Sequence, residues 1–305
     1  MKELGLNPPT ATSPIAITEP FLLFTVEGVK ELRRDLSSRD RSEARMKAEA
    51  GNLYRPRECE ALLNAVSQAA GVELVPVFDY DIAHTNVQVD AEKAKNEDIY
   101  QDLPDAEPPK QPTDPSLIDQ KLPTGDINDK NAVVGDWHND VFPWVCVLML
   151  SDPTGMSGGE TALRKGDGSF LKVRGPELGY AVVMQGGSIH HAALKQHGAG
   201  ERITMVTSLR PKDPLAIDGT TLGRVKIVSD PDALFKQWTT YRMDVVSARA
   251  LALKKKFVEE SLSGEEIREE MKKWVDEQKK YLDFTVTEME PWTGEDESDA
   301  NRWRK

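Results

Sequence analysis

Residues 138 to 150 read His-Asn-Asp-Val-Phe-Pro-Trp-Val-Cys-Val-Leu-Met-Leu, and they predict a buried strand led by polar side chains. Trp144 to Leu150 is an almost unbroken apolar run, which is typical of a strand covered on both faces. His138 and Asp140 stand two positions apart just before it. Because residues i and i+2 of a strand point to the same face, both side chains can reach one ion.

Short strands are predicted on both sides of this run. They are separated by polar or glycine-containing turns such as Ser157-Gly158-Gly159, and they cover residues 72–78, 82–89, 161–163, 169–173, 180–185 and 202–209. Many short strands joined by such turns favour a barrel or a sandwich. We therefore predict a mixed α+β chain whose strand-rich centre lies at residues 133–210.

The flanking sequence predicts helices. The first dozen residues resemble a loose arm, and helices are expected over residues 26–49 and 56–71. Asp230 and Asp232 suit the first turn of a helix reaching residue 262, since negative charge is favourable there. Ser263 and Glu266 form a capping-box pattern for a second helix, which we expect to reach residue 283. These C-terminal helices would either cap the barrel or pair two chains.

These elements predict three parts of the chain. Residues 1–71 form an N-terminal arm with helices, residues 72–214 a core, and residues 215–305 a helical extension. The core contains an acidic, proline-rich insertion at residues 90–132. Long segments of this kind are either disordered or act as functional lids, and the sequence leaves both readings open.

The composition excludes several classes of partner. The chain carries 39 Lys and Arg against 51 Asp and Glu, a net charge of −12. Such a chain has no electrostatic footprint for nucleic acid and would be repelled by an anionic membrane surface. It has two cysteines and no CxxC, and neither a secretory signal nor a membrane-spanning run is visible. We expect a cytoplasmic protein with a small-molecule substrate.

The third metal ligand has to come from elsewhere in the fold. His190 and His191 follow the predicted strand at residues 180–185, and adjacent strand residues point oppositely, so only one of them is expected to bind. Two histidines and one carboxylate form the facial triad of non-haem Fe(II). Arg202 and Thr204 share one face of the next strand, where a guanidinium and a hydroxyl suit a planar carboxylate. The set indicates a metal beside an anionic ligand.

At these residues the chain resembles a known family. His138-x-Asp140, His191 and Arg202-x-Thr204 are similar to the HxD…H…RxS/T pattern of the Fe(II)/2-oxoglutarate-dependent dioxygenases. His191-Ala192-Ala193 resembles the distal-histidine region of the prolyl-hydroxylase-like branch. Residues 179–211 are similar to fungal oxygenases of small-molecule metabolism. The resemblance covers residues 72–211, and the flanking helices lie outside it.

The resemblance implies a double-stranded β-helix, or jelly roll. Fe(II) would be bound by His138, Asp140 and His191, with His191 preferred over His190 because its spacing to the arginine is closer to that of the family. The cosubstrate 2-oxoglutarate would place its distal carboxylate on Arg202 and Thr204. O2 would convert it to succinate and CO2 while a C–H bond is oxidised. The carboxylate at position 140 argues for hydroxylation, desaturation or ring closure rather than halogenation.

Other residues near the motif have two readings each. Trp137, Phe142 and Trp144 would line an apolar substrate pocket or pack in the core. Asn86 would hydrogen-bond the cosubstrate or face solvent. Arg164 would hold a substrate carboxylate or form a surface ion pair.

The leading hypothesis is an oxygenase acting on an amino-acid-derived molecule or a secondary metabolite. One alternative is a prolyl-hydroxylase-like enzyme that modifies protein. A second is a metal-dependent, non-oxidative enzyme on a cupin-like barrel. A third is a binding module without activity.

Overall fold

The computed structural model describes residues 1–37, 60–77, 82, 84–89, 133–134, 136–154, 156–175, 177–197, 201–223 and 225–291. The predicted insertion at residues 90–132 lies outside the described residues, and so does the choice between lid and disorder. The same holds for residues 38–49 and 56–59 of the two predicted N-terminal helices.

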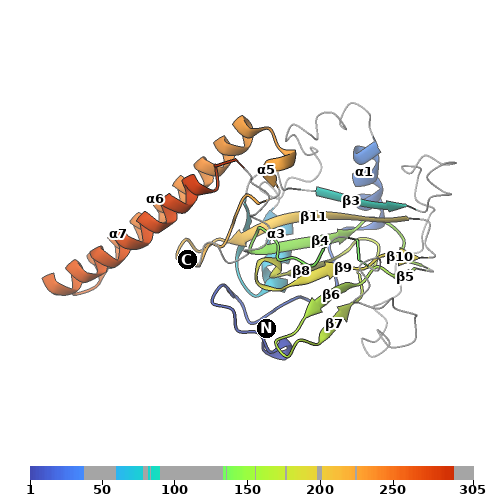
Figure 1. Ribbon diagram of the computed structural model, residues 1–305, viewed down its shortest axis with the longest axis horizontal. Helices are drawn as coiled ribbons and strands as arrows, with labels where there is room; N and C mark the ends of the chain where they lie inside the picture. The colour runs from blue at the N-terminus through green and yellow to red at the C-terminus, as the bar shows by residue number, and fades with distance from the viewer. Residues whose placement is uncertain are drawn as a thin grey trace.

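A six-stranded antiparallel sheet forms the larger layer of the core (Figure 1). Its strand order is β1-β8-β4-β11-β2, and β3 also pairs with β11. The strands are β1 (Phe21–Leu22), β2 (Leu74–Pro76), β3 (His84–Val89), β4 (Trp144–Met149), β8 (Tyr180–Met184) and β11 (Glu201–Pro211). The predicted buried strand is confirmed as β4, between β8 and β11.

A smaller antiparallel layer packs against the first. It contains β7 (Phe170–Val173), β6 (Thr161–Arg164) and β9 (His191–Ala193), with β5 (Ser157–Gly158) paired to β10 (Gln196–His197). Val145 and Met184 of the large sheet join Leu163 of the small sheet in one buried cluster. The two sheets therefore face each other, and the chain is mixed α+β as predicted.

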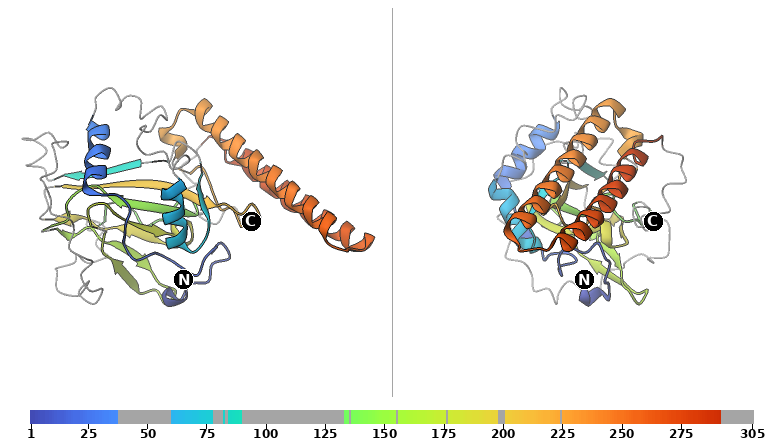
Figure 2. Two further views of the ribbon diagram at one scale, coloured as in Figure 1. Left: turned by 180° about the vertical axis from the view of Figure 1, so that it is seen from behind. Right: turned by 90° about the vertical axis from the view of Figure 1, so that its left-hand side faces the viewer.

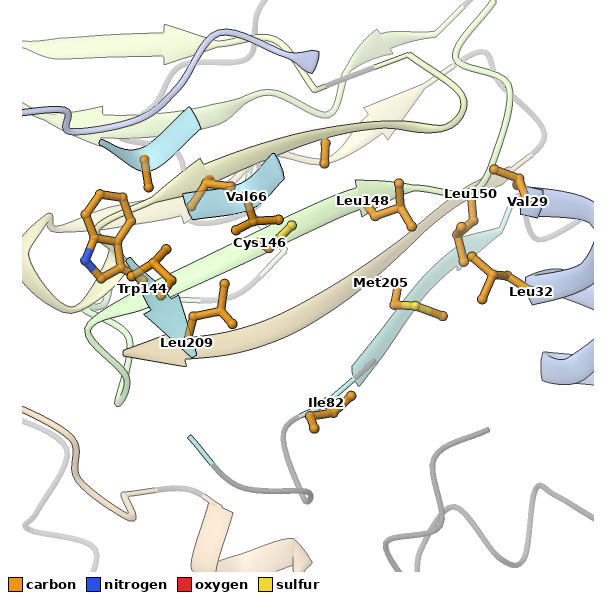
Figure 3. Close-up of a cluster of buried hydrophobic side chains, with 14 of the residues drawn as sticks. Val29, Leu32, Val66, Ile82, Trp144, Cys146, Leu148, Leu150, Met205 and Leu209 are labelled. Carbon is orange, nitrogen blue, oxygen red and sulfur yellow. The ribbon is translucent and has the colours of Figure 1, made fainter. Parts of the chain in front are cut away.

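The side chains of β4 alternate between two faces, and each face packs in a different buried cluster. Val145 faces the small sheet, whereas Trp144, Cys146 and Leu148 face the other side. There α1 (Val26–Ser37) contributes Val29 and Leu32, and α3 (Glu60–Ala70) contributes Val66 (Figure 3). Both helices lie on the same side of the large sheet, facing the viewer in the left view of Figure 2. Burial raises the pKa of the Cys146 thiol to about 12, so it is a core residue as predicted.

The prediction of a loose N-terminal arm is wrong. The chain begins with a short 3-10 helix, η1 (Lys2–Leu4), and Met1 and Leu4 are buried in the cluster between the sheets. The Gln185 amide donates to the carbonyl oxygens of Ser13 and Ile15 and accepts from the Thr12 amide. These contacts join residues far apart in sequence, which a local reading of prolines and serines does not reveal.

The C-terminal helices form an antiparallel hairpin that projects from the sheets (Figures 1 and 2). After the short α5 (Val225–Val228), α6 (Pro231–Glu259) starts at Asp230, whose side chain accepts from the Ala233 amide. The capping box of Ser263 and Glu266 opens α7 (Gly264–Thr287), as predicted. Within the described part of the chain, no helix has the length and apolarity needed to cross a membrane.

A buried carboxylate joins the hairpin to the segment that follows β11. Asp218 accepts from Arg242 Nη1 at 3.1 Å and from the Tyr281 hydroxyl at 2.7 Å, and also from the Tyr241 hydroxyl. Arg242 is fully buried and also donates through Nε to the Thr285 hydroxyl at 2.8 Å. Burial alone would raise the pKa of Asp218, but Arg242 and the hydroxyl donors outweigh it and hold the pKa below its ordinary value.

We predict that Asp218→Asn lowers the free energy of unfolding at pH 7 by roughly 3–5 kcal/mol, because it leaves a buried guanidinium unpaired. The depressed pKa of Asp218 means that its contribution is complete above the pKa of an unfolded aspartate and is lost as the pH falls. Urea denaturation between pH 7 and pH 3 measures both effects. The exposed Asp276→Asn on α7 is the matched control, and equal stability of the two variants would contradict the prediction.

Candidate metal centre

His138, Asp140 and His191 place their ligand atoms within 4.8 Å of one another. Asp140 Oδ1 lies 3.5 Å from His138 Nε2 and 3.6 Å from His191 Nε2. The two histidines are antiparallel bridge partners, and each backbone amide donates to the other's carbonyl at 2.9 Å. Directly opposed residues of an antiparallel pair point to the same side, so this pairing brings the imidazoles together.

Both imidazoles are oriented by the nitrogen that does not face Asp140. His138 Nδ1 lies 2.8 Å from the Asp136 carbonyl, and His191 Nδ1 lies 2.8 Å from the Ile189 carbonyl. A carbonyl oxygen only accepts, so each Nδ1 carries the proton and each Nε2 keeps its lone pair. This is the hydrogen-bonding arrangement of metal-ligating histidines.

Asp140 is held against the backbone of Gly186. The Asp140 amide donates to the Gly186 carbonyl at 3.0 Å, and a Cβ on Gly186 would lie 1.7 Å from Asp140 Oδ2. Burial would raise the pKa of Asp140, but His191 and His138 outweigh it and lower the pKa. Asp140 Oδ2 is buried, and no described residue forms a hydrogen bond with it. A buried carboxylate oxygen without a partner is costly, so this donor set fits a bound cation.

The structure brings His191, not His190, to His138 and Asp140. His190 faces away, with Nδ1 3.2 Å from Asn139 Oδ1 and its ring stacked on Trp137. The expected location differs in one respect. We expected His191 near the end of the strand at residues 180–185. It instead opens a separate strand, β9, after the 3-10 turn η5 (Gly186–Ser188). That turn is also where Gly186 makes room for Asp140.

Arg202 and Thr204 share one face of β11, and both are buried. Thr204 is paired with Asn86 on β3, so the exposed Asn86 lies on the same face as the two predicted anion-binding residues. Within the described part of the chain, Arg202 Nε is buried and has no hydrogen-bond partner. Burial lowers the pKa of Arg202, and the nearby carboxylate of Glu160 opposes that effect. A buried guanidinium with a free donor suits an anionic ligand.

Arg33 and Glu160, which were not predicted as site residues, contact or lie near the start of β11 beside Arg202. Arg33 of α1 donates through Nη1 to the Leu150 carbonyl at 3.0 Å and to Glu201 at 2.5 Å, which fixes the first residue of β11. Glu160 follows two glycines with positive φ, and its Oε2 is buried without a partner. No local pattern reveals Arg33, whereas the Gly158-Gly159 pair marks the close approach of the backbone to Arg202.

Two of the four predicted substrate residues lie in the core. Trp144 is fully buried on the α1–α3 side of the large sheet, and its Nε1 donates to the Thr12 hydroxyl at 2.9 Å. Phe142 packs with Trp238 and Leu222 at the base of the hairpin. Both side chains are therefore buried in core clusters.

The other two lie on the outer face of the small sheet. Leu163 is the cross-strand partner of His191, so the next pair along, Arg164 and Phe170, points to the opposite face. Arg164 is exposed there, and Trp137 stacks on Phe170 with ring centroids 5.0 Å apart. Trp137 and Arg164 therefore lie on the face of the small sheet that is opposite to Leu163 and His191.

We predict that Gly186→Ala displaces Asp140 and lowers the free energy of unfolding by roughly 1–3 kcal/mol, the usual cost of overpacking. The added methyl group would meet the Asp140 carboxylate. Gly264→Ala is the control, since a Cβ there meets nothing within 4 Å. Thermal and urea unfolding of the two variants measure the difference, and a Gly186→Ala protein as stable as the control would refute the close packing described here.

Comparison with known proteins gives only distant similarities. No family model matches the chain, and no curated protein matches it. Among solved structures, it is similar to IDO from Bacillus thuringiensis at 16% identity, a TM-score of 0.22, and coverage of 25% of this chain and 38% of the other. A Pseudomonas putida prolyl-4-hydroxylase matches at 15% identity, with a TM-score of 0.31 and coverage of 65% and 94%.

A third similar structure is a non-heme monooxygenase, ThoJ, in a nickel complex. It matches at 13% identity with a TM-score of 0.36, over 68% of this chain and 77% of the other. The chain thus spans well under two thirds of the first structure but most of the other two. Because all three TM-scores are low, the case for a function rests on the geometry of the site itself.

Proposed function

We propose that the chain is a non-haem Fe(II) oxygenase that uses 2-oxoglutarate and O2 to oxidise a C–H bond of a small molecule, with release of succinate and CO2. The observation that carries this proposal is the three-ligand cluster of His138, Asp140 and His191, in which both Nε2 atoms are turned toward the Asp140 carboxylate. Two imidazoles and one carboxylate on one side of an ion leave open positions for a cosubstrate and oxygen.

The proposed barrel is a double-stranded β-helix. Two antiparallel sheets face each other around one buried cluster, and the His138 bridge to His191 adds the metal-binding segment to the edge of β9. In this proposal residues 72–214 form the catalytic core, with residues 1–71 and 215–305 as additions to it. This arrangement supports a jelly roll because β2 and β11, from the two ends of the core sequence, pair side by side in the large sheet.

Bound iron would supply the activation of O2, driven by the oxidative decarboxylation of 2-oxoglutarate. The chain's own residues would prepare that site. The carbonyls of Asp136 and Ile189 hold the imidazoles in the ligating tautomer, and the half-exposed His138 side chain marks the side open to a substrate. Asp140 supplies the negative charge and keeps its coordination position filled, which favours hydroxylation, desaturation or ring closure.

Arg202 would bind the distal carboxylate of the cosubstrate. Its guanidinium forms a planar fork that matches a carboxylate, and Thr204 adds a hydroxyl donor on the same face. The unpartnered Arg202 Nε supports this role, since a buried donor gains most from an anion that completes its hydrogen bonds. Asn86, the cross-strand partner of Thr204, is placed to add a further contact. An amino-acid-derived or secondary metabolite in the cytoplasm remains the proposed substrate.

The adjacent histidines offer a matched test of the metal site. We expect His191→Ala to weaken Fe(II) binding by more than about a hundredfold, because changes to residues that merely support a ligand already cost 10–100-fold. His190→Ala is expected to bind Fe(II) nearly as the parent chain does, since His190 contacts Asn139 and Trp137 instead. Anaerobic calorimetry with Fe(II) measures both. Equal losses in the two variants would contradict the assignment.

The cosubstrate site has its own test. Arg202→Gln removes a charge-assisted hydrogen-bond donor, which is worth about 1.5–3 kcal/mol, so the Kd for 2-oxoglutarate should rise by at least about tenfold. Arg164→Gln makes the same chemical change on the outer face of the small sheet and should leave that Kd unchanged. Succinate formation and anaerobic binding of 2-oxoglutarate to the Fe(II)-loaded protein are the readouts. Iron binding without any binding of 2-oxoglutarate would favour a metal enzyme of another class.

A further inference from the structure

A cavity of about 620 Å³ lies where the hairpin meets the large sheet. One wall is the N-terminal half of α6, and the other consists of the edge strand β2, the end of β11 and one residue of α3. Its lining includes Leu63, Val75, Val77, Arg210, Lys212 and Lys236. None of these residues belongs to the candidate metal centre, so this cavity is a separate feature of the molecule.

Arg210 is the most informative residue of the cavity. Its Nη1 donates to the Pro211 carbonyl at 3.0 Å, and the guanidinium carbon lies 5.1 Å from the centroid of the Tyr241 ring. Its Nε, however, is buried and has no hydrogen-bond partner among the residues that the structure describes. A buried donor on a charged group carries a large desolvation cost unless an acceptor reaches it. An anion in the cavity would supply that acceptor.

The other charged residues of the lining also favour an anion. Lys212 and Lys236 join Arg210, whereas Asp244 is the one acidic residue in the lining. Lys212 is paired with Glu73 at 3.3 Å, which leaves Arg210 and Lys236 against Asp244. This positive excess stands out in a chain whose net charge is −12.

The wall opposite α6 is partly apolar. Leu63 comes from α3, and Val75 and Val77 come from the β2 segment. An inorganic anion would contact only the cationic residues and would leave these apolar residues exposed to water. Cavities of about 300–1,000 Å³ with apolar walls and a few polar groups are typical of sites for small organic ligands.

We propose that this cavity binds an organic carboxylate with an apolar body, its carboxylate on Arg210 and Lys236 and its body against Leu63, Val75 and Val77. Such a ligand would bridge α6 and the sheet, and so stabilise the attachment of the hairpin. This inference does not depend on the proposed oxygenase activity, because it concerns different residues on a different part of the fold.

The fluorescent anion 8-anilinonaphthalene-1-sulfonate is a suitable probe, because it joins an aromatic body to one negative charge. We expect the full chain to bind one probe molecule, and decanoate to displace it. Arg210→Gln and Lys236→Gln should each raise the Kd of the probe, by about tenfold for the arginine, whose hydrogen bond to an anion is charge-assisted. Lys255→Gln, the same change on the exposed far half of α6, should leave the Kd unchanged.

Each other outcome overturns the proposal. Unchanged probe binding in Lys236→Gln, an exposed position whose substitution leaves the core intact, would exclude the cavity even if Arg210→Gln fails to fold. Displacement by decyltrimethylammonium as effective as by decanoate would show that charge plays no part. Displacement by inorganic phosphate at the same concentration as decanoate would show that the apolar walls play none. Loss of probe binding in Arg202→Gln would place the probe in the barrel instead.

Discussion

The backbone pairing of His138 with His191 is the constraint on which the candidate site depends. Their reciprocal hydrogen bonds, both 2.9 Å long, set two imidazoles side by side before any metal is considered. Asp140 completes the set only because Gly186 has no side chain where its carboxylate lies. His191 is also paired with Leu163 of β6, so the bridge to His138 is attached to the small sheet. A preorganised set of ligands binds with less loss of conformational entropy.

The base of the C-terminal hairpin packs against the residues that directly follow Asp140. The residue after Asp140, Val141, accepts a hydrogen bond at 2.8 Å from the amide of Thr221. Phe142 then packs against Trp238 of α6. The segment between the candidate ligand Asp140 and β4 therefore packs against the C-terminal part of the chain. That part lies outside residues 72–211. The buried Asp218–Arg242 pair joins the base of the hairpin to the segment that follows β11.

The sequence correctly predicted the features that depend on residues close together in the chain. The apolar run of β4, the capping box of α7 and the spacing of two between His138 and Asp140 each depend on neighbours in sequence. The errors arose where contacts are long-range. The N-terminal arm is ordered by Gln185, and Arg33 reaches Glu201 from a different helix. The sequence did not decide whether Trp144 lines a pocket or packs in the core, because a strand that is apolar on both faces does not show which face lines the site.

The central claim is that His138, Asp140 and His191 bind one iron ion in a barrel that accepts 2-oxoglutarate beside Arg202. The most direct test is anomalous diffraction at the iron edge from crystals loaded with Fe(II) and 2-oxoglutarate without oxygen. The predicted result is a single iron peak between both Nε2 atoms and the Asp140 carboxylate, with the cosubstrate extending to Arg202. An iron peak elsewhere, or coordination by His190, would contradict it.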